Sequence, residues 1–363
     1  MNKKMSERTR KELAIVLQKE INCYLHNSYF LCTILAFENL RPWFYENYIQ
    51  LYTSGEKEVR HAGKPEVILD FYGGWTKPKI FFEEQYFDRC EMKEIAIISK
   101  IKQCINEERY IYTYVDEFFT IQGMNEHFAH DIYIYGYDDS KEEILVIGFD
   151  IHMNFVKYTI PYNSFKNGFK NGIVLSETYD KYGGKRYFFN VKMKVDENYQ
   201  YKIQMDSVLT LFNDYLHSIN TYLHSNDENC DMYKNPNCKY GLATYDEVLK
   251  MLKSTYEMGG KTDYRAFHTL YEHKALMKKR LDYFSQILKL NDEEKSLFSE
   301  VGQKILELGK LLKFKCIKYN ILETKKLLEQ MIADVQKLKS LEQQGYLKIY
   351  SIIDLHKKDI DFE

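Results

Sequence analysis

Two patterns of apolar and polar residues divide the chain near residue 200. Before that point, short runs rich in β-branched and aromatic residues alternate with turns. After it, apolar residues recur at helical spacing almost to the end of the chain. The sequence therefore predicts an α+β domain over residues 1–203 and an appended helical domain over residues 204–363.

The predicted strands centre on a hairpin. Residues 131–137 (DIYIYGY) alternate in character, a turn follows at residues 138–140, and residues 144–149 return as a second strand. Two strands joined by a short turn pair antiparallel, so the start of the first lies beside the end of the second. Further strands are predicted at residues 110–115, 155–160 and 186–195.

The predicted helices are of two kinds. Residues 23–37 carry no charged side chain and are apolar on nearly every side, which predicts a buried helix. The helices of the second half are amphipathic, and Asn291 with Glu294 forms a capping box for one of them. These helices are predicted at residues 205–223, 245–256, 264–288, 293–314 and 320–344.

Composition excludes several classes of function. The 363 residues include 51 basic and 53 acidic ones, for a net charge of −2, so no basic surface indicates nucleic-acid binding. The charged N-terminus has no apolar core of a secretory signal. Residues 23–37 are too few to cross a bilayer. We therefore expect a soluble cytoplasmic protein that does not bind membranes.

The seven cysteines do not form the pattern of a disulfide framework. They lie at positions 23, 32, 90, 104, 230, 238 and 316. An odd, scattered set in a chain that is not secreted should stay reduced, and most of its members should be small buried hydrophobic residues. Cys23 differs because it begins a predicted helix, where the positive end of the helix dipole favours a thiolate.

A histidine and an aspartate follow at positions that suit a thiol nucleophile. His130 precedes the first strand of the hairpin and Asp150 ends the second, so the two side chains can meet. Together they would supply a base for Cys23 and a carboxylate that holds the base in one tautomer. His127 is a rival for the base.

An amide near the nucleophile could stabilise the oxyanion that forms after attack on a carbonyl. Gln18 precedes Cys23 by five residues and is the predicted donor. Asn22 and backbone amides are alternatives.

Three segments carry resemblances to known enzymes. Residues 18–39 (QKEINCYLHNSYFLCTILAFEN) resemble the nucleophile helix of bacteriocin leader peptidases, papain-like enzymes that cut after double-glycine leaders. The helical segment 271–284 (YEHKALMKKRLDYF) resembles the butirosin-type biosynthetic acyltransferases, which join a papain-like half to long helices. Residues 115–139 (VDEFFTIQGMNEHFAHDIYIYGYDD) are similar to papain-like amide synthetases of polythioamide biosynthesis.

The resemblance implies a papain-like fold and a thioester-dependent acyltransferase of thiotemplated natural-product biosynthesis. Cys23 would be the nucleophile, His130 the base, Asp150 the orienting carboxylate and Gln18 the oxyanion donor. The acyl group would arrive on the phosphopantetheine of an acyl or peptidyl carrier protein, and a small amine would accept it. No metal and no other cofactor is implied, and a homodimer stays open.

Two alternative functions stay open. The same residues would serve a leader peptidase or amidase with water as the acceptor. A catalytically inactive scaffold that binds a carrier protein or peptide is the other alternative. Tyr24 and Ile151 favour it, because the leader peptidases have glycine and proline at these positions.

Overall fold

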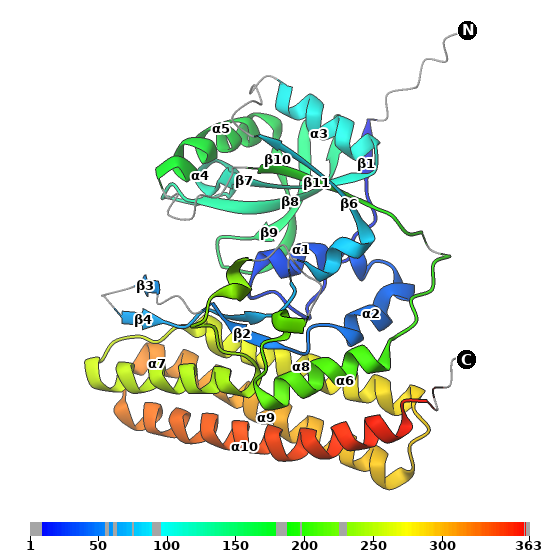
Figure 1. Cartoon of the computed structure of the whole chain (residues 1–363). Coiled ribbons are helices and arrows are strands. Elements are labelled where there is room, and N and C mark those ends of the chain that lie inside the picture. The colour runs from blue at the N-terminus through cyan, green and yellow to red at the C-terminus, as the bar shows by residue number, and fades with distance from the viewer. Residues whose placement is uncertain are drawn as a thin grey trace. The chain divides into compact units, whose positions relative to one another are not determined.

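The chain forms two compact units, each built from two separate stretches (Figure 1). Unit 1 comprises residues 1–39 and 78–200, and unit 2 comprises residues 40–77 and 201–363. The chain passes from unit 1 to unit 2 between residues 200 and 201, close to the boundary expected at residue 203. Residues 40–77, which were expected in the first domain, group with the C-terminal helices.

The computed structural model describes most of the chain. The described residues are 9–54, 58–60, 64–74, 76–88, 96–178, 187–196, 198–224, 231–358 and 360. Over these residues the protein is a mixed α and β chain with a helical C-terminal region, as the sequence predicts.

Unit 1 contains a seven-stranded sheet whose neighbours are antiparallel, in the order β10-β9-β8-β7-β11-β6, with β1 paired to β8. The strands are β1 (Arg10–Glu12), β6 (Phe82–Asp88), β7 (Arg109–Asp116), β8 (Ala129–Asp138), β9 (Glu143–Phe149), β10 (Phe155–Pro161) and β11 (Tyr187–Met193). The predicted hairpin is confirmed as β8 and β9. The three other predicted strands correspond to β7, β10 and β11.

Helices cover both faces of this sheet (Figure 1). They are α1 (Leu25–Ile34), α3 (Ile97–Asn106), α4 (Glu117–Thr120) and α5 (Tyr162–Thr178), with short 3-10 turns η1 (Glu38–Leu40) and η2 (Lys77–Phe81). Phe30 of α1 contacts Phe189, and Phe169 of α5 contacts Phe188. Because consecutive residues of a strand point to opposite faces, α1 and α5 lie on opposite sides of the sheet.

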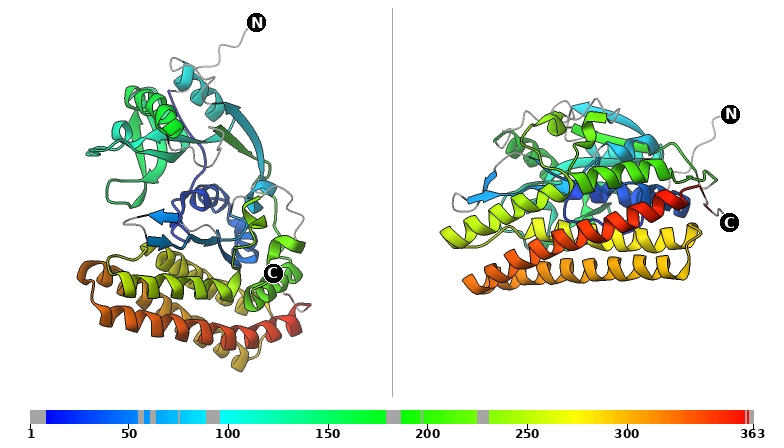
Figure 2. Two further views of the ribbon diagram at one scale, coloured as in Figure 1. Left: turned by 60° about the vertical axis from the view of Figure 1, so that its left-hand side comes forward. Right: turned by 60° about the horizontal axis from the view of Figure 1, so that its bottom comes forward.

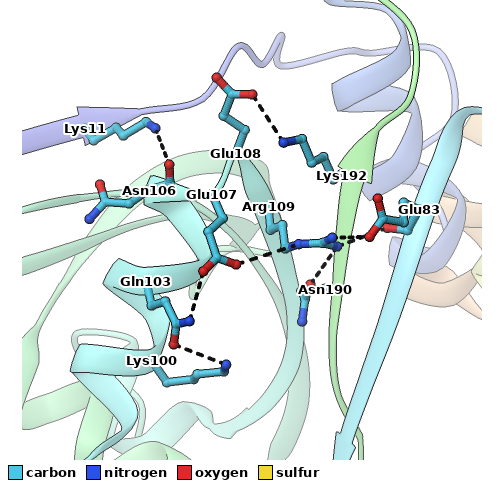
Figure 3. A network of polar contacts seen from close by, with 10 residues as sticks. All are labelled: Lys11, Glu83, Lys100, Gln103, Asn106, Glu107, Glu108, Arg109, Asn190 and Lys192. Atoms are coloured by element: carbon cyan, nitrogen blue, oxygen red, sulfur yellow. Dashed lines mark hydrogen bonds and ion pairs between the residues drawn. The ribbon is translucent and has the colours of Figure 1, made fainter.

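A buried arginine ties three neighbouring strands of the sheet together (Figure 3). Arg109 begins β7 and is only 6% exposed. Its guanidinium forms an ion pair with Glu83 of β6 and donates to the Asn190 side chain of β11 at 3.3 Å. Since arginine stays charged, these acceptors hold the strands in one register.

Unit 2 is mainly helical. Its elements are α2 (Arg41–Glu46), α6 (Met205–His217), α7 (Thr244–Met258), α8 (Tyr264–Ile287), α9 (Asp292–Leu322), α10 (Lys325–His356), the short strands β2 (Leu51–Thr53), β3 (Glu58–Arg60), β4 (Lys64–Glu66) and β5 (Leu69–Phe71), and the turns η5 (Thr221–His224), η6 (Asp231–Lys234) and η7 (Gly241–Ala243). The long helices α8, α9 and α10 pack along one another (Figure 2). The capping box predicted for Asn291 and Glu294 is confirmed at the start of α9. Within the described part of the chain, none of the helices combines the length and apolarity needed to span a bilayer.

The core of unit 2 contains a fully buried ion pair. Lys274 of α8 and Glu342 of α10 are both inaccessible, and their charged atoms are 2.6 Å apart. The hydroxyl groups of Tyr215 and Tyr245 donate to the same carboxylate at 2.6 and 2.9 Å. Such a pair is tolerated in a core only because these hydrogen bonds offset the loss of water around the charges.

Two further buried side chains of α8 hold the segment between α2 and β2. Arg280 donates to the carbonyl oxygens of Tyr45 and Asn47, and His273 contacts the carbonyl oxygen of Ile49 at 2.8 Å. Both side chains are inaccessible to solvent. Residues 45–49 are therefore an integral part of the helical unit, which explains why its boundary lies so far from residue 203.

Candidate functional site

Cys23 lies at the N-terminal end of the buried helix α1. Helix α1 begins at Leu25, Tyr24 is its N-cap, and Cys23 directly precedes that cap. The Cys23 thiol is reduced and partly exposed. The positive end of the helix dipole at this position favours the thiolate form.

The other described cysteines have a different environment. They are buried, and they are Cys32, Cys104, Cys238 and Cys316. Burial raises the pKa of the Cys32 thiol to about 12, so it stays protonated at neutral pH. The positions of Cys90 and Cys230 fall outside the described residues. Among the described cysteines, Cys23 thus has the exposure that a nucleophile needs.

Helix α1 contacts strand β8 through two hydrogen bonds. Thr33 shares a hydrogen bond of 2.9 Å with the Tyr133 hydroxyl. One helical turn earlier, the Tyr29 hydroxyl donates to the carbonyl oxygen of Asp131 at 2.9 Å. Residues nearer the N-terminus of α1 therefore contact residues nearer the start of β8. The helix extends four more residues, about 6 Å, from Tyr29 to its first residue Leu25, and Cys23 lies two residues before that start.

His130 is the second residue of β8 and is held by a carboxylate. Its Nδ1 lies 2.6 Å from Oε1 of Glu117, the first residue of α4. A carboxylate only accepts hydrogen bonds, so Nδ1 carries a proton. The His130 Nε2 atom lies 3.4 Å from Oδ1 of Asp131, whose carboxylate also accepts from the Tyr112 hydroxyl at 2.6 Å.

The surroundings of His130 favour its charged form. Burial alone would lower the pKa of the imidazole, but the Glu117 hydrogen bond and the charges of Asp131 and Glu117 raise it above the ordinary value. The rings of Phe128 and Phe149 flank the imidazole, with centroids 5.4 and 6.1 Å away. His130 is therefore suited to act as an imidazolium counter-ion in a site with apolar walls.

The carboxylate that orients His130 is not the predicted one. Asp150 accepts hydrogen bonds from the backbone of His152 at 2.9 Å and of Asn154 at 2.8 Å, which closes the turn after β9. Burial would raise the pKa of Asp150, but the bonds from Asn154 hold it below the ordinary value. The orienting hydrogen bond predicted for Asp150 is made by Glu117.

Strand register explains this correction. The described pairing of β8 with β9 ends at Tyr133 opposite Ile147, before it reaches His130. The pairing of β8 with β7 continues, with Val115 opposite His130. The residues that follow β7 therefore meet His130, and Glu117 is among them.

Gln18 is a structural residue of the loop before α1. It is 5% exposed, and its Oε1 accepts from the backbone amides of Glu20 and Ile21 at 2.7 and 3.1 Å. Its Nε2 donates to the carbonyl oxygens of Ile21 and Ser28 at 2.6 and 3.5 Å. Both amide hydrogens are thus engaged, so in this arrangement the oxyanion role predicted for Gln18 would require the side chain to give up one of these acceptors.

We expect Gln18→Ala to destabilise the protein. The substitution leaves buried backbone groups without partners, which should lower the free energy of unfolding by about 1–3 kcal/mol. Urea unfolding measures the loss, with the exposed Gln103→Ala as the control, for which a change within about 0.5 kcal/mol is expected. Unchanged stability with a fall in acylation of about 10²- to 10³-fold would instead restore the oxyanion role.

Glu117 was not among the residues predicted from the sequence, although the sequence contains a signal for it. The prediction rested on β9 as the neighbour of β8. If β7 is placed on the other side of β8, Val115 falls opposite His130 and Asp116 opposite Ala129, so the next residue, Glu117, lies close to His130. The carboxylate that binds His130 therefore depends on the order of β7, β8 and β9 in the sheet, which local sequence patterns do not give.

The rival base His127 also has a carboxylate partner. Its Nδ1 lies 2.6 Å from Oδ2 of Asp116, and its side chain is 48% exposed. Two adjacent acidic residues thus each hold one of two nearby histidines. His130 is the more buried of the two, with 25% of its side chain exposed.

Comparison with known proteins leaves the family open. No known protein-family profile and no curated protein matches the sequence. Within the described residues, no three side chains of His, Cys, Asp or Glu gather where they could hold a metal ion. The resemblance to butirosin-type acyltransferases therefore stays a prediction.

Proposed function

We propose that this protein is a papain-like cysteine acyltransferase that moves an acyl group from a carrier-protein thioester to an amine. The observation that supports this proposal most is the hydrogen bond between His130 and Glu117, at the start of strand β8, which α1 contacts, with Cys23 two residues before the first residue of α1. A thiol at a helix N-terminus and an imidazole held by a carboxylate are the parts that thiol acyl transfer requires.

The first step would form an acyl-enzyme. The Cys23 thiolate attacks the thioester carbonyl carbon, a carbon–sulfur bond forms to Cys23, and the bond to the pantetheine sulfur breaks. His130 gives its proton to the leaving thiolate, and Glu117 keeps the imidazole oriented during the transfer. With Gln18 engaged elsewhere, backbone amides of the first turn of α1 are the donors for the oxyanion.

The second step would transfer the acyl group to the amine. The amine nitrogen attacks the acyl carbon and gives up a proton to a histidine of the site, the carbon–nitrogen bond forms, and the Cys23 thiolate leaves with the electron pair. The thioester is already activated, so the reaction needs no nucleotide.

Intact-protein mass spectrometry tests the proposal. Incubation with a panel of pantetheine thioesters should add one acyl group, which peptide mapping should place on Cys23. Release of that group by an amine faster than by water would favour the transferase, and the reverse would favour the peptidase or amidase. If no donor acylates the protein and Cys23 is inert to iodoacetamide, the binding scaffold becomes the better explanation.

Glu117→Gln is expected to move the alkaline limb of the acylation rate to lower pH. Glu117 helps to raise the pKa of His130, so loss of its charge lowers that pKa. Acylation needs the imidazolium form, which is then lost at lower pH, and a shift of about one pH unit is expected. The pH profile of acyl-adduct formation measures it. The exposed Glu126→Gln is the matched control, and an equal shift there would contradict the role of Glu117.

A further inference from the structure

A second histidine–carboxylate pair lies beside the first one. His127 Nδ1 is 2.6 Å from Asp116 Oδ2, and Asn171 of α5 donates to the same oxygen at 2.6 Å. Asp116 and Glu117 are adjacent in sequence, and Asp116 lies opposite Ala129 in the sheet. The α-carbons of His127 and His130 can be at most about 11 Å apart, because the two residues are three positions apart in the chain.

Asp116 is a fully engaged carboxylate. It is completely buried, and its Oδ1 accepts from the backbone amides of Phe118 at 3.2 Å and Phe128 at 3.0 Å. With His127 and Asn171 on Oδ2, four donors surround the group. Burial alone would raise the pKa of Asp116, but these hydrogen bonds hold it below the ordinary value. Asp116 therefore fixes His127 Nδ1 as a donor, which leaves Nε2 as the acceptor.

Two glycines of α5, Gly168 and Gly172, allow the helix to pack closely against the backbone of Asp116. A β-carbon at Gly168 would lie 3.1 Å from the Asp116 carbonyl oxygen, and one at Gly172 would lie 3.1 Å from its backbone nitrogen. These glycines flank Asn171 and permit the close approach that brings its amide to the carboxylate. The hydrogen bond between His127 and Asp116 is thus supported by further contacts from α5. Such supporting contacts hold a side chain in one orientation.

His127 presents its free edge beside aromatic side chains. Its ring centroid is 4.2 Å from that of Phe118, and its side chain is 48% exposed. Phe118 is itself 40% exposed. An imidazole with a buried carboxylate on one nitrogen and an accessible second nitrogen has the arrangement of a general base.

We propose that His127 is the base that takes the proton from the acceptor amine. This inference rests on the proposed function. When the amine attacks the acyl-enzyme, its proton passes to His127 Nε2, the carbon–nitrogen bond forms, and the carbon–sulfur bond breaks with the electron pair on Cys23. His127 then releases the proton to solvent, and His130 takes up a proton from solvent in place of the one that left with the pantetheine thiol. Each imidazole thus serves one half-reaction.

The two half-reactions of His127→Gln separate this role from others. Acylation by a pantetheine thioester in the absence of amine should stay within about twofold of the wild type. Release of the isolated acyl-enzyme by a primary amine should slow by about 10²-fold, the usual contribution of a general base, while release by water should not change. Hydroxylamine, which attacks without base assistance, should restore most of the lost rate.

Asn171→Ala and His217→Gln complete the test. Asn171→Ala removes one donor from Asp116 and should give a smaller loss in the amine step alone. His217 is an exposed histidine of unit 2, and its replacement should change neither step. Equal slowing of both steps in His127→Gln would overturn the proposal, and so would no slowing of either. Absence of any acyl-enzyme on the wild type would instead overturn the proposed function itself.

Discussion

Cys23→Ala is expected to abolish acyl-enzyme formation and to slow amide formation by at least about 10³-fold. The thiol is the atom to which the acyl group is attached, and no neighbouring residue can take its place once it is removed. Intact mass after incubation with a pantetheine thioester measures the first effect, and amide release measures the second. The variant should stay folded, because Cys23 lies outside α1 and is only partly buried.

Cys32→Ala is the matched control for this experiment. Cys32 lies in α1, is fully buried, and has a pKa of about 12, so iodoacetamide should not label it at pH 7 while it labels Cys23. The control should acylate at nearly the wild-type rate despite some loss of stability. An acyl adduct that persists in Cys23→Ala would contradict the assignment of the nucleophile.

The largest effects on stability are expected at the buried ion pair of unit 2. Lys274→Met or Glu342→Gln removes one partner and leaves the other charge buried, which should lower the free energy of unfolding by about 3–5 kcal/mol. The double variant Lys274→Met/Glu342→Leu should lose less than the sum of the two single losses, because no buried charge remains. Urea unfolding at neutral pH measures all three.

The stability of the Glu342→Gln variant should depend on pH. Burial already lowers the pKa of Lys274, and loss of Glu342 lowers it further, so the Glu342→Gln variant regains stability as pH rises.

The exposed pair of Glu300 and Lys304 provides the control for these variants. Their side chains are 62% and 63% exposed and lie 3.4 Å apart. Glu300→Gln should change the free energy of unfolding by no more than about 0.5 kcal/mol, since water screens such a pair. If Lys274→Met or Glu342→Gln were as mild as Glu300→Gln, the buried pair would have no special energetic role.

Local sequence patterns predicted the individual helices and strands better than they predicted which of these elements pack together in each unit. Alternation along residues 131–137 gave β8, and the Asn291 capping box gave the start of α9, because both signals arise within a few residues. The placement of residues 40–77 with the helices depends on distant contacts such as those of Arg280 with Tyr45 and Asn47. No periodicity within either segment encodes that pairing.

Some residues of the candidate site could likewise be predicted from local sequence, and others depended on contacts between distant segments. The position of Cys23 before a buried helix and that of His130 at a strand start followed from local sequence. Glu117 in place of Asp150 required the register of β7 against β8. The engagement of Gln18 required the path of the loop before α1, which bends so that the side chain reaches Ile21 and Ser28.

The discontinuous units have a consequence for how the protein is made. Residues 40–77 leave the ribosome before the helices α6 to α10 with which they pack. At about 5–20 residues per second, translation of the remaining chain takes roughly 15–60 s. During that interval Trp43 and Phe44, which end fully buried, have no core to enter. The yield of native protein should therefore depend on how well chaperones shield this segment, and slower growth at low temperature should not by itself replace them.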